Sequence, residues 1–273
     1  MEHPVVWALV GFVIGTLGTL IGAGGGFILV PILIIVRPDL DPGTITAISM
    51  AVVAANAISG SGAYMYKRRV DYKGGLIFAL VTIPGSILGV WTVRILPRHT
   101  FDVVFSVLLI VLAAFLLVRG GKKKTVAPVT DRKGWIHRRL VDREGETFEY
   151  SFNLRNGSLL SVVVGYISPL LGIGGGIIHV PAMVEWLRFP VHVATATSHF
   201  ILAIMATVTV ATHYYEGAYD QPEVLELVFS LAVGVIPGAQ LGAYLSGKLH
   251  GKAIIRALAV SLILVGIRIL LSA

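Results

Sequence analysis

Long runs of apolar residues recur along nearly the whole chain, from Val5 to Leu271. A helix that crosses the hydrocarbon core of a bilayer needs about 20 mostly apolar residues. Hydrophobic residues make up 55% of the chain, the mean hydropathy is +0.83 and only 14% of the residues are charged, whereas a soluble domain is typically about 25% charged. Because the backbone must satisfy its own hydrogen bonds in lipid, we expect an all-α polytopic membrane protein, with the lipid bilayer as a partner.

The apolar residues fall into segments that a single polar stretch divides into two groups. The segments cover residues 5–36, 43–66, 74–95, 101–118, 157–187, 192–215, 223–246 and 253–271. The division predicts a first membrane repeat at 1–118, a linker at 119–156 and a second membrane repeat at 157–273.

The linker is basic at its start, with a run of lysines at Lys122–Lys124. Farther on, Phe148, Tyr150 and Phe152 alternate with polar residues, which is the period of a β-strand. Residues Trp135 to Val141 are the expected partner strand of a β-hairpin. Because an isolated hairpin is marginally stable in water, it is expected to pack on the membrane helices or on another subunit.

An internal repeat relates the two groups of apolar segments. Three motifs occur in the same order in each half, at nearly constant spacing. They are Leu20–Pro31 with Leu170–Pro181, Thr46–Ser49 with Thr195–Ser198, and Ile83–Gly89 with Ile236–Gly242. Such a series indicates a duplicated unit.

Loop charges predict that the two halves have opposite orientations. The loop Lys67–Arg69 is basic, whereas the matching loop Glu216–Glu223 is acidic, and basic loops stay on the cytoplasmic side. Inversion requires an odd number of membrane crossings in each half. Because each half has four apolar segments, one of them is expected to enter and leave the membrane on the same side. The predicted fold is two tandem inverted-topology repeats, each with a Gly-broken first segment plus three transmembrane helices. We place it in the cell inner (plasma) membrane, with the linker 119–156 cytoplasmic.

Each half carries a glycine run inside its first apolar segment. The glycines are Gly22, Gly24, Gly25 and Gly26 in the first half, and Gly172, Gly174, Gly175 and Gly176 in the second. Glycine costs about 1 kcal/mol relative to alanine inside a helix, so the helix is expected to open there and restart near Phe27 and Ile177. A helix start has unpaired N–H groups and a positive dipole end, which attract anions.

Broken segments at matching positions of inverted halves point to the substrate site of a transporter. The two helix starts are therefore expected to hold a small oxyanion between them. Close helix packing is the alternative role of small residues in membranes.

Polar residues within the apolar segments are further candidates for the substrate site. They are Thr46, Ser49, Asn56, Thr195, Ser198, His199 and Gln240. Hydrogen bonding between helices is the alternative role for each of them. His179 and His213 are candidates for a proton relay, since histidine titrates near neutral pH when unperturbed, and a structural role is the alternative for both.

With these motifs in view, the sequence resembles the sulfite exporter TauE/SafE family, a family of sulfite and organosulfonate permeases. The resemblance covers nearly the whole chain. The positions that carry it are Gly22–Gly26 with Pro31 and Gly172–Gly176 with Pro181. It implies export or uptake of sulfite, sulfonates or related sulfur anions, whereas the residues alone indicate only a small oxyanion.

A secondary transporter of a small anion is the function that these features favour. The alternatives are an anion channel and a membrane-bound sensor that docks a partner through the hairpin. An enzyme is not expected, because no nucleophile with a base and no set of metal ligands is apparent. The chain has no cysteine, and we expect no metal and no cofactor. The positive residues flank apolar runs, so nucleic acid is not an expected partner, while self-association into a homo-oligomer is left open.

Overall fold

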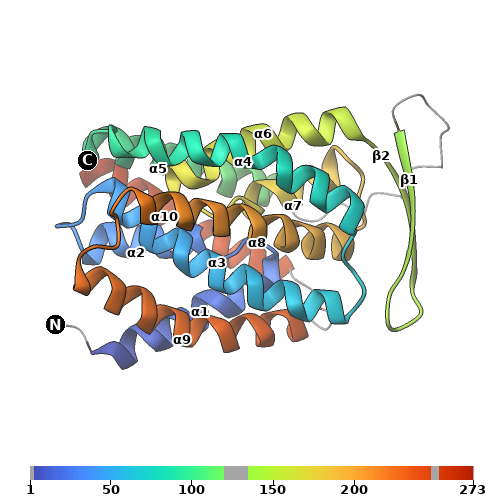
Figure 1. Cartoon of the computed structure of the whole chain (residues 1–273), viewed down its shortest axis with the longest axis horizontal. Coiled ribbons are helices and arrows are strands. Elements are labelled where there is room, and N and C mark those ends of the chain that lie inside the picture. Colours follow the sequence, from blue (N-terminus) through green and yellow to red (C-terminus); the bar gives the residue numbers. More distant parts are fainter. Residues whose placement is uncertain (1–2, 120–134, 247–251, 273) are drawn as a thin grey trace.

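Long helices make up the body of the molecule, and a β-hairpin stands at one end of it (Figure 1). The computed structural model describes residues 3–119, 135–246 and 252–272. The Lys122–Lys124 cluster and most of the basic loop before the last segment lie outside the described residues.

The first half contains α1 (Pro4–Ile21), α2 (Gly26–Val36), α3 (Pro42–Tyr66), α4 (Tyr72–Arg94) and α5 (Arg98–Arg119). The hairpin consists of β1 (Trp135–Val141) and β2 (Thr147–Asn153). The second half contains α6 (Leu154–Leu171), α7 (Gly176–Glu185), α8 (Val191–Tyr215), α9 (Pro222–Leu245) and α10 (Lys252–Ser272).

Six helices within the described ranges are long and apolar enough to cross a membrane. They are α1, α3, α4, α6, α8 and α9. The prediction of an all-α polytopic membrane protein is therefore confirmed.

Both glycine runs break the helix in which they lie. The first helix piece of each half ends at a left-handed glycine, Gly22 with φ 83° and Gly172 with φ 66°, a conformation that glycine adopts without steric cost. The pieces are unequal, with 18 and 11 residues in the first half and 18 and 10 in the second. They are unequal because each glycine run lies past the middle of its apolar segment.

Helices of one half pack mainly on helices of the other half. The helix α1 packs on α9 of the other half, α6 packs on α4, and the central helices α3 and α8 pack on each other. Glycines permit the close approach at equivalent places: a Cβ on Gly15 would lie 2.5 Å from the carbonyl oxygen of Val235, and one on Gly165 would lie 2.6 Å from that of Thr82. The matching contacts show that equivalent helices of the two halves pack in a similar way.

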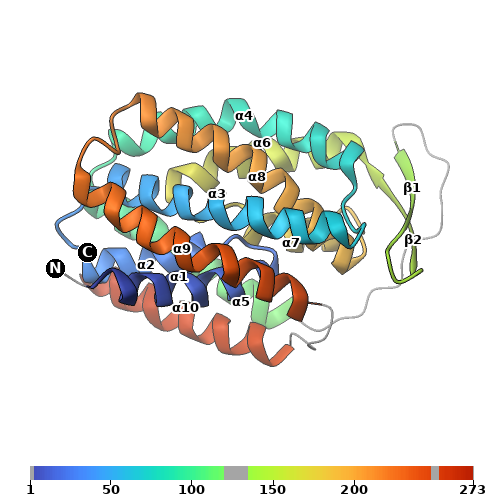
Figure 2. The same cartoon turned by 60° about the horizontal axis from the view of Figure 1, so that its bottom comes forward.

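The two halves begin at opposite ends of the molecule. The helix α1 starts beside the N-terminus, whereas α6 starts at the far end, where it follows β2 of the hairpin (Figures 1 and 2). Opposite starts are what an inverted repeat requires. The orientation of each half in a membrane stays a prediction.

The hairpin lies where the alternating sequence predicts one. Its strands are antiparallel, with Arg138 opposite Tyr150 and Leu140 opposite Phe148. The aromatic side chains of β2 are buried against the helices, so the hairpin is held by the membrane domain.

Candidate functional site

Two buried loops, the first glycine loop (Gly22–Gly26) and the second glycine loop (Gly172–Gly176), meet between α3 and α8. Every residue of both loops is buried. A Cβ on Gly26 would lie 2.3 Å from the carbonyl oxygen of Gly172, and one on Gly176 would lie 2.2 Å from that of Gly22. The loops therefore pack backbone against backbone, and only glycine fits at positions 26 and 176 in this conformation.

Several backbone N–H groups at the starts of α2 and α7 have no backbone acceptor among the residues that the structure describes. Three in each half make no backbone hydrogen bond to any part of the chain that the structure describes. They belong to Gly25, Gly26 and Phe27 in the first half, and to Gly174, Gly175 and Ile177 in the second. A buried N–H group without an acceptor is costly, and at a helix start such groups form a ready anion site.

A buried polar network adjoins the first glycine loop. Asn56 Nδ2 donates to the carbonyl oxygen of Gly24 at 2.8 Å, and Asn56 Oδ1 accepts a hydrogen bond from the Thr19 hydroxyl. His199 Nε2 lies 3.3 Å from Thr19 Oγ1, and the Tyr64 hydroxyl donates to the Thr19 carbonyl oxygen at 2.9 Å. The His199 ring is fully buried, and its Nδ1 has no hydrogen-bond partner within residues 3–119, 135–246 and 252–272.

The second glycine loop has a less polar surrounding. Met205 Cε lies 3.4 Å from where a Cβ of Gly175 would be, in the place that Asn56 Nδ2 takes beside Gly25. The Ser168 hydroxyl lies 3.2 Å from the same point and has no hydrogen-bond partner. The repeat therefore conserves the backbone of the loops but not the side chains around them.

Four predicted site residues lie on the central helices, and their side chains differ in what they contact. Ser49 donates to the Gly172 carbonyl oxygen at 2.6 Å, whereas its counterpart Ser198 is buried without a partner. The Thr46 and Thr195 hydroxyls bond carbonyl oxygens of their own helices. Thr195 nevertheless touches the first loop, since its Cγ2 lies 2.7 Å from where a Cβ of Gly22 would be.

The side chains of three other candidates make no hydrogen bond to the glycine loops in the part of the chain that the structure describes. Gln240 is exposed, and its Nε2 donates to the carbonyl oxygen and hydroxyl of Ser59. His179 is buried in α7, with its Nε2 3.2 Å from Ser161 Oγ. His213 is buried near the end of α8, and its Nε2 has no partner.

Thr19 and Tyr64 belong to the network, although sequence reasoning did not select them. The spacing of Asn56, Gly60 and Tyr64 on α3 puts them on one face of the helix, and that face adjoins His199: a Cβ on Gly60 would lie 2.7 Å from His199 Cδ2. This spacing is the signal that could have identified Tyr64. A threonine in an apolar helix normally bonds its own backbone, so Thr19 gave no comparable signal.

The described residues contain no cluster of three or more histidine, cysteine, aspartate or glutamate side chains that could hold a metal ion. The polar groups that the structure does place at the loops are backbone amides and the side chains of Ser49 and Asn56.

Membrane-length helices in two related halves that meet at buried helix breaks define a multi-pass membrane protein. The chain matches the family described as sulfite exporter TauE/SafE over residues 7–269, and it belongs to that family.

Curated relatives support the same class. The chain is 32% identical over 272 residues to "Probable membrane transporter protein YunE" of Bacillus subtilis, and the aligned region covers 97% of each chain. It is 26% identical to a "Probable membrane transporter protein" of Xylella fastidiosa, over 88% of this chain and 82% of that one. It is 25% identical to "Probable membrane transporter protein MJ0441" of Methanocaldococcus jannaschii, over 89% and 86% of the two chains. The chain is therefore a membrane transporter. No solved structure is significantly similar to it.

Proposed function

We propose that the protein is a secondary transporter of a small sulfur-containing oxyanion, such as sulfite or a sulfonate, which binds at the amide groups that begin α2 and α7. The observation that carries the proposal is the set of buried N–H groups without acceptors, three at each helix start. An oxyanion supplies the acceptors that these groups lack.

The charge of the surroundings also favours an anion. The helices α1, α3, α6 and α8, which contact the loops, contain no aspartate or glutamate, so a bound anion meets no carboxylate there. The donors are amides and neutral side chains, not fixed cations. Binding by neutral donors can be weak enough for release, which transport requires.

The sulfur assignment is supported by the family description, which names sulfite. A sulfite ion or a sulfonate group has three oxygens, and each helix start offers three N–H groups. The relatives' names give no substrate.

Closure of the loops favours a carrier over a channel. A channel needs a continuous wetted path with weak sites, whereas both glycine loops are buried and in contact. An ion reaches the amides only if the loops separate, so binding is coupled to a conformational change. Slow saturable flux is the expected behaviour.

The basic loop Lys67–Arg69 supports an inner-membrane orientation with the hairpin in the cytoplasm. It lies at the hairpin end, where Arg69 and Asp142 form an ion pair. Because basic loops stay in the cytoplasm, the hairpin end is proposed to face inward and the acidic Glu216–Glu223 loop outward.

Flux into proteoliposomes tests the proposal. Purified protein is reconstituted, and uptake of sulfite, thiosulfate, sulfate, sulfoacetate and a carboxylate control is measured with and without a pH gradient. Saturable flux of one sulfur anion is the expected result. If folded protein transports none of these anions, the sulfur assignment is wrong. Unitary currents in electrical recordings would show that the protein is a channel and not a carrier.

A further inference from the structure

The hairpin is tied to the α3–α4 loop (Lys67–Asp71) by a buried ion pair. Arg69 donates from Nη2 to Asp142 Oδ2 at 2.8 Å and from Nε at 3.0 Å, and the two side chains are 5% and 0% exposed. The other carboxylate oxygen of Asp142 accepts the N–H groups of Glu144 and Glu146, each at 2.9 Å. Burial raises the pKa of Asp142, but the hydrogen bonds from Arg69 and these amides outweigh it and hold the pKa below its ordinary value. The pair is therefore charged at neutral pH.

A second chain of hydrogen bonds runs from the hairpin through the first half into the second. The Tyr150 hydroxyl donates to Asp71 Oδ2 at 2.8 Å, and the other Asp71 oxygen caps α4 by accepting the N–H of Gly74. The N–H of Asp71 itself donates to the Thr197 hydroxyl of α8 at 3.0 Å. The start of α4 is thus fastened both to the hairpin and to α8.

Aromatic packing fastens the hairpin to both halves as well. The rings of Tyr150 and Phe152 lie 4.6 and 4.8 Å from the ring of Phe189, which precedes α8. Phe152 also packs edge-on against Phe78 of α4, at 5.7 Å. The hairpin therefore bridges the two halves at its end of the molecule.

At the opposite end, a second set of contacts between the halves surrounds Glu216, the residue that follows α8. Glu216 pairs with Arg94 at the end of α4 and accepts a hydrogen bond from Trp91 Nε1 at 3.2 Å. The Arg94 and Glu216 side chains are 47% and 28% exposed. One buried bond, from the Tyr219 hydroxyl to the Ala47 carbonyl oxygen at 2.8 Å, adds to this joint.

The repeat relates the two joints. Glu216 matches Lys67, since 216 − 67 and 198 − 49 both equal 149 for the matched pair Ser198 and Ser49. Lys67 follows α3 and donates to the Ala243 carbonyl oxygen of α9 at 2.5 Å, as Glu216 follows α8 and bonds α4. Lys67 and Glu216 thus make matched links from a central helix to the other half, and the hairpin lies at the Lys67 end.

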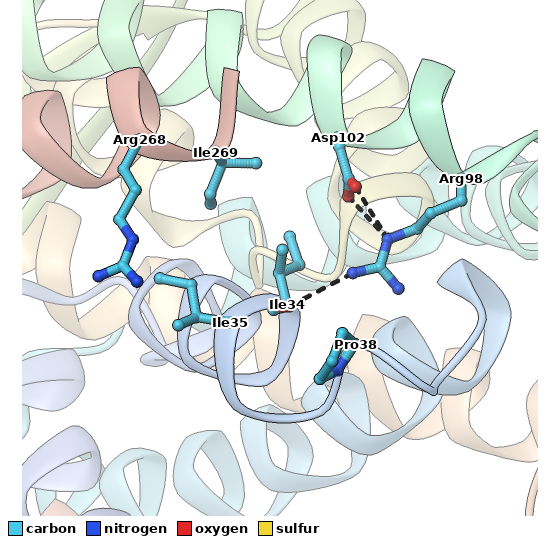
Figure 3. Close-up of a pocket in the computed structure, with 7 residues that line it drawn as sticks. All are labelled: Ile34, Ile35, Pro38, Arg98, Asp102, Arg268 and Ile269. Atoms are coloured by element: carbon cyan, nitrogen blue, oxygen red, sulfur yellow. Dashed lines mark hydrogen bonds and ion pairs between the residues drawn. The ribbon is translucent and has the colours of Figure 1, made fainter. Parts of the chain in front are cut away.

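A pocket of about 360 Å³ also lies at the Glu216 end, between the end of α2 and the helices α5 and α10. Arg98, Asp102 and Arg268 line it together with isoleucine side chains, and Arg98 bonds Asp102 across its edge (Figure 3).

We propose that the hairpin is a clasp that holds one end of the transport pathway closed, and that the Glu216 joint is a weaker latch that opens first. The inference rests on the proposed carrier function. In transporters built from inverted repeats, one half rocks against the other, so an end opens only when the contacts between halves at that end break. Separating a buried ion pair is costly, whereas a partly exposed pair contributes little. The hairpin end is therefore the less frequently open one.

Single cysteines can report the opening of each end, because the chain has no cysteine of its own. The two reporter variants are Ser61→Cys and Thr209→Cys. Position 61 lies five residues before the end of α3 beside the hairpin, and position 209 lies six residues before the end of α8 beside Glu216. Both native side chains are buried, at 2% and 0% exposed. The rate of modification by a small charged methanethiosulfonate is measured on purified protein in lipid nanodiscs without substrate.

The expected result is slower modification at position 61 than at position 209. Asp142→Asn and, separately, the milder Tyr150→Phe should raise the rate at 61 about tenfold or more, as expected for loss of a charged hydrogen bond, and leave 209 unchanged. Arg94→Gln should raise only the rate at 209. The matched control is Glu149→Gln, which breaks an exposed hairpin ion pair with Arg139 and should change neither rate.

The proposal is overturned if the clasp variants raise both rates alike or neither, or if position 61 reacts as fast as 209 in the unmodified background. Size-exclusion elution and thermal melting confirm that each variant is folded. Sulfite flux is measured separately: absent flux contradicts the proposed function, while the labelling rates still test the clasp because they require no substrate.

Discussion

At position 26 the chain has room for a hydrogen atom and little more. A Cβ there would lie 2.3 Å from the Gly172 carbonyl oxygen and 2.9 Å from Ser49 Oγ. Both neighbours are held in place, the first by backbone and the second by its hydrogen bond to the same oxygen. Alanine at position 26 must therefore displace one loop from the other.

Gly26→Ala is expected to lower anion flux about 100-fold, since small misplacements at a reacting or binding centre have effects of that order. Flux in proteoliposomes is the measurement. Gly62→Ala is the control on α3, because no atom lies within 4 Å of its added Cβ and alanine favours the helix. Normal flux in Gly26→Ala would show that the loop contact is not required for transport.

Asn56 is the side chain that distinguishes the first glycine loop from the second. Replacing it with methionine, the residue found at position 205, removes the hydrogen bond to the Gly24 carbonyl oxygen and the one from the Thr19 hydroxyl. We expect Asn56→Met to lower the free energy of unfolding by about 2 kcal/mol and to weaken substrate binding. Met205→Leu should cost less than about 1.5 kcal/mol and leave affinity unchanged. Equal effects of the two variants on affinity would contradict a special role for Asn56.

The sequence predicts the glycine breaks well, and it predicts the surrounding side chains only in part. A break is local, because four glycines in five residues disfavour a helix wherever the segment lies. Which side chain reaches the break depends on contacts far apart in the chain, such as that of His199 with Thr19. Gln240 illustrates the limit: its pattern suggested a loop donor, and its hydrogen bonds go to Ser59 on an exposed face.

Among the elements, the exchange of helices between halves depends on close glycine contacts. Gly15 of α1 meets α9 and Gly165 of α6 meets α4, with Cβ positions 2.5 and 2.6 Å from carbonyl oxygens. Alanine normally stabilises a helix relative to glycine. Any loss of stability on replacing these glycines with alanine therefore comes from disturbed packing between the helices. Gly15→Ala and Gly165→Ala are each expected to lower the free energy of unfolding by about 1–3 kcal/mol, as measured by thermal or denaturant unfolding. A loss of stability in only one of the two variants would contradict the equivalence of these two contacts.

The hairpin's attachment has a defined pH dependence. Since the pKa of Asp142 is lowered in the folded protein, its contribution to stability is present above the unfolded pKa of about 3.9 and is lost as the pH falls below that value. Hydrogen-exchange protection of β1 is therefore expected to stay constant between about pH 5 and 8. Asp142→Asn should reduce that protection throughout this range. Protection that fell as the pH dropped from 8 to 5 would mean that another group controls the attachment.

At the scale of the whole molecule, repeated motifs and apolar segment lengths were sufficient to predict an all-α membrane protein. They could not show that α1 packs on α9, or that the hairpin reaches both halves. A motif match records descent from a common unit, whereas helix partners are set by surfaces that meet only in the folded chain. Alternation in β2 did predict a strand, and its aromatic residues Phe148, Tyr150 and Phe152 are buried, as is Ser151 between them.

The inverted repeat predicts the orientation of each half in the membrane, and equivalent loops of the two halves test it directly. The loop after α2 contains exposed Asp39, and the loop after α7 contains exposed Arg188. Inversion puts equivalent loops on opposite sides of the bilayer, and the basic hairpin end puts Arg188 inside. An impermeant thiol reagent should therefore label Asp39→Cys in intact cells and Arg188→Cys only after permeabilisation. Labelling of both cysteines from one side of the membrane would contradict inversion. Labelling of Arg188→Cys in intact cells, and of Asp39→Cys only after permeabilisation, would agree with inversion but place the hairpin outside. The clasp would then close the outer end of the pathway.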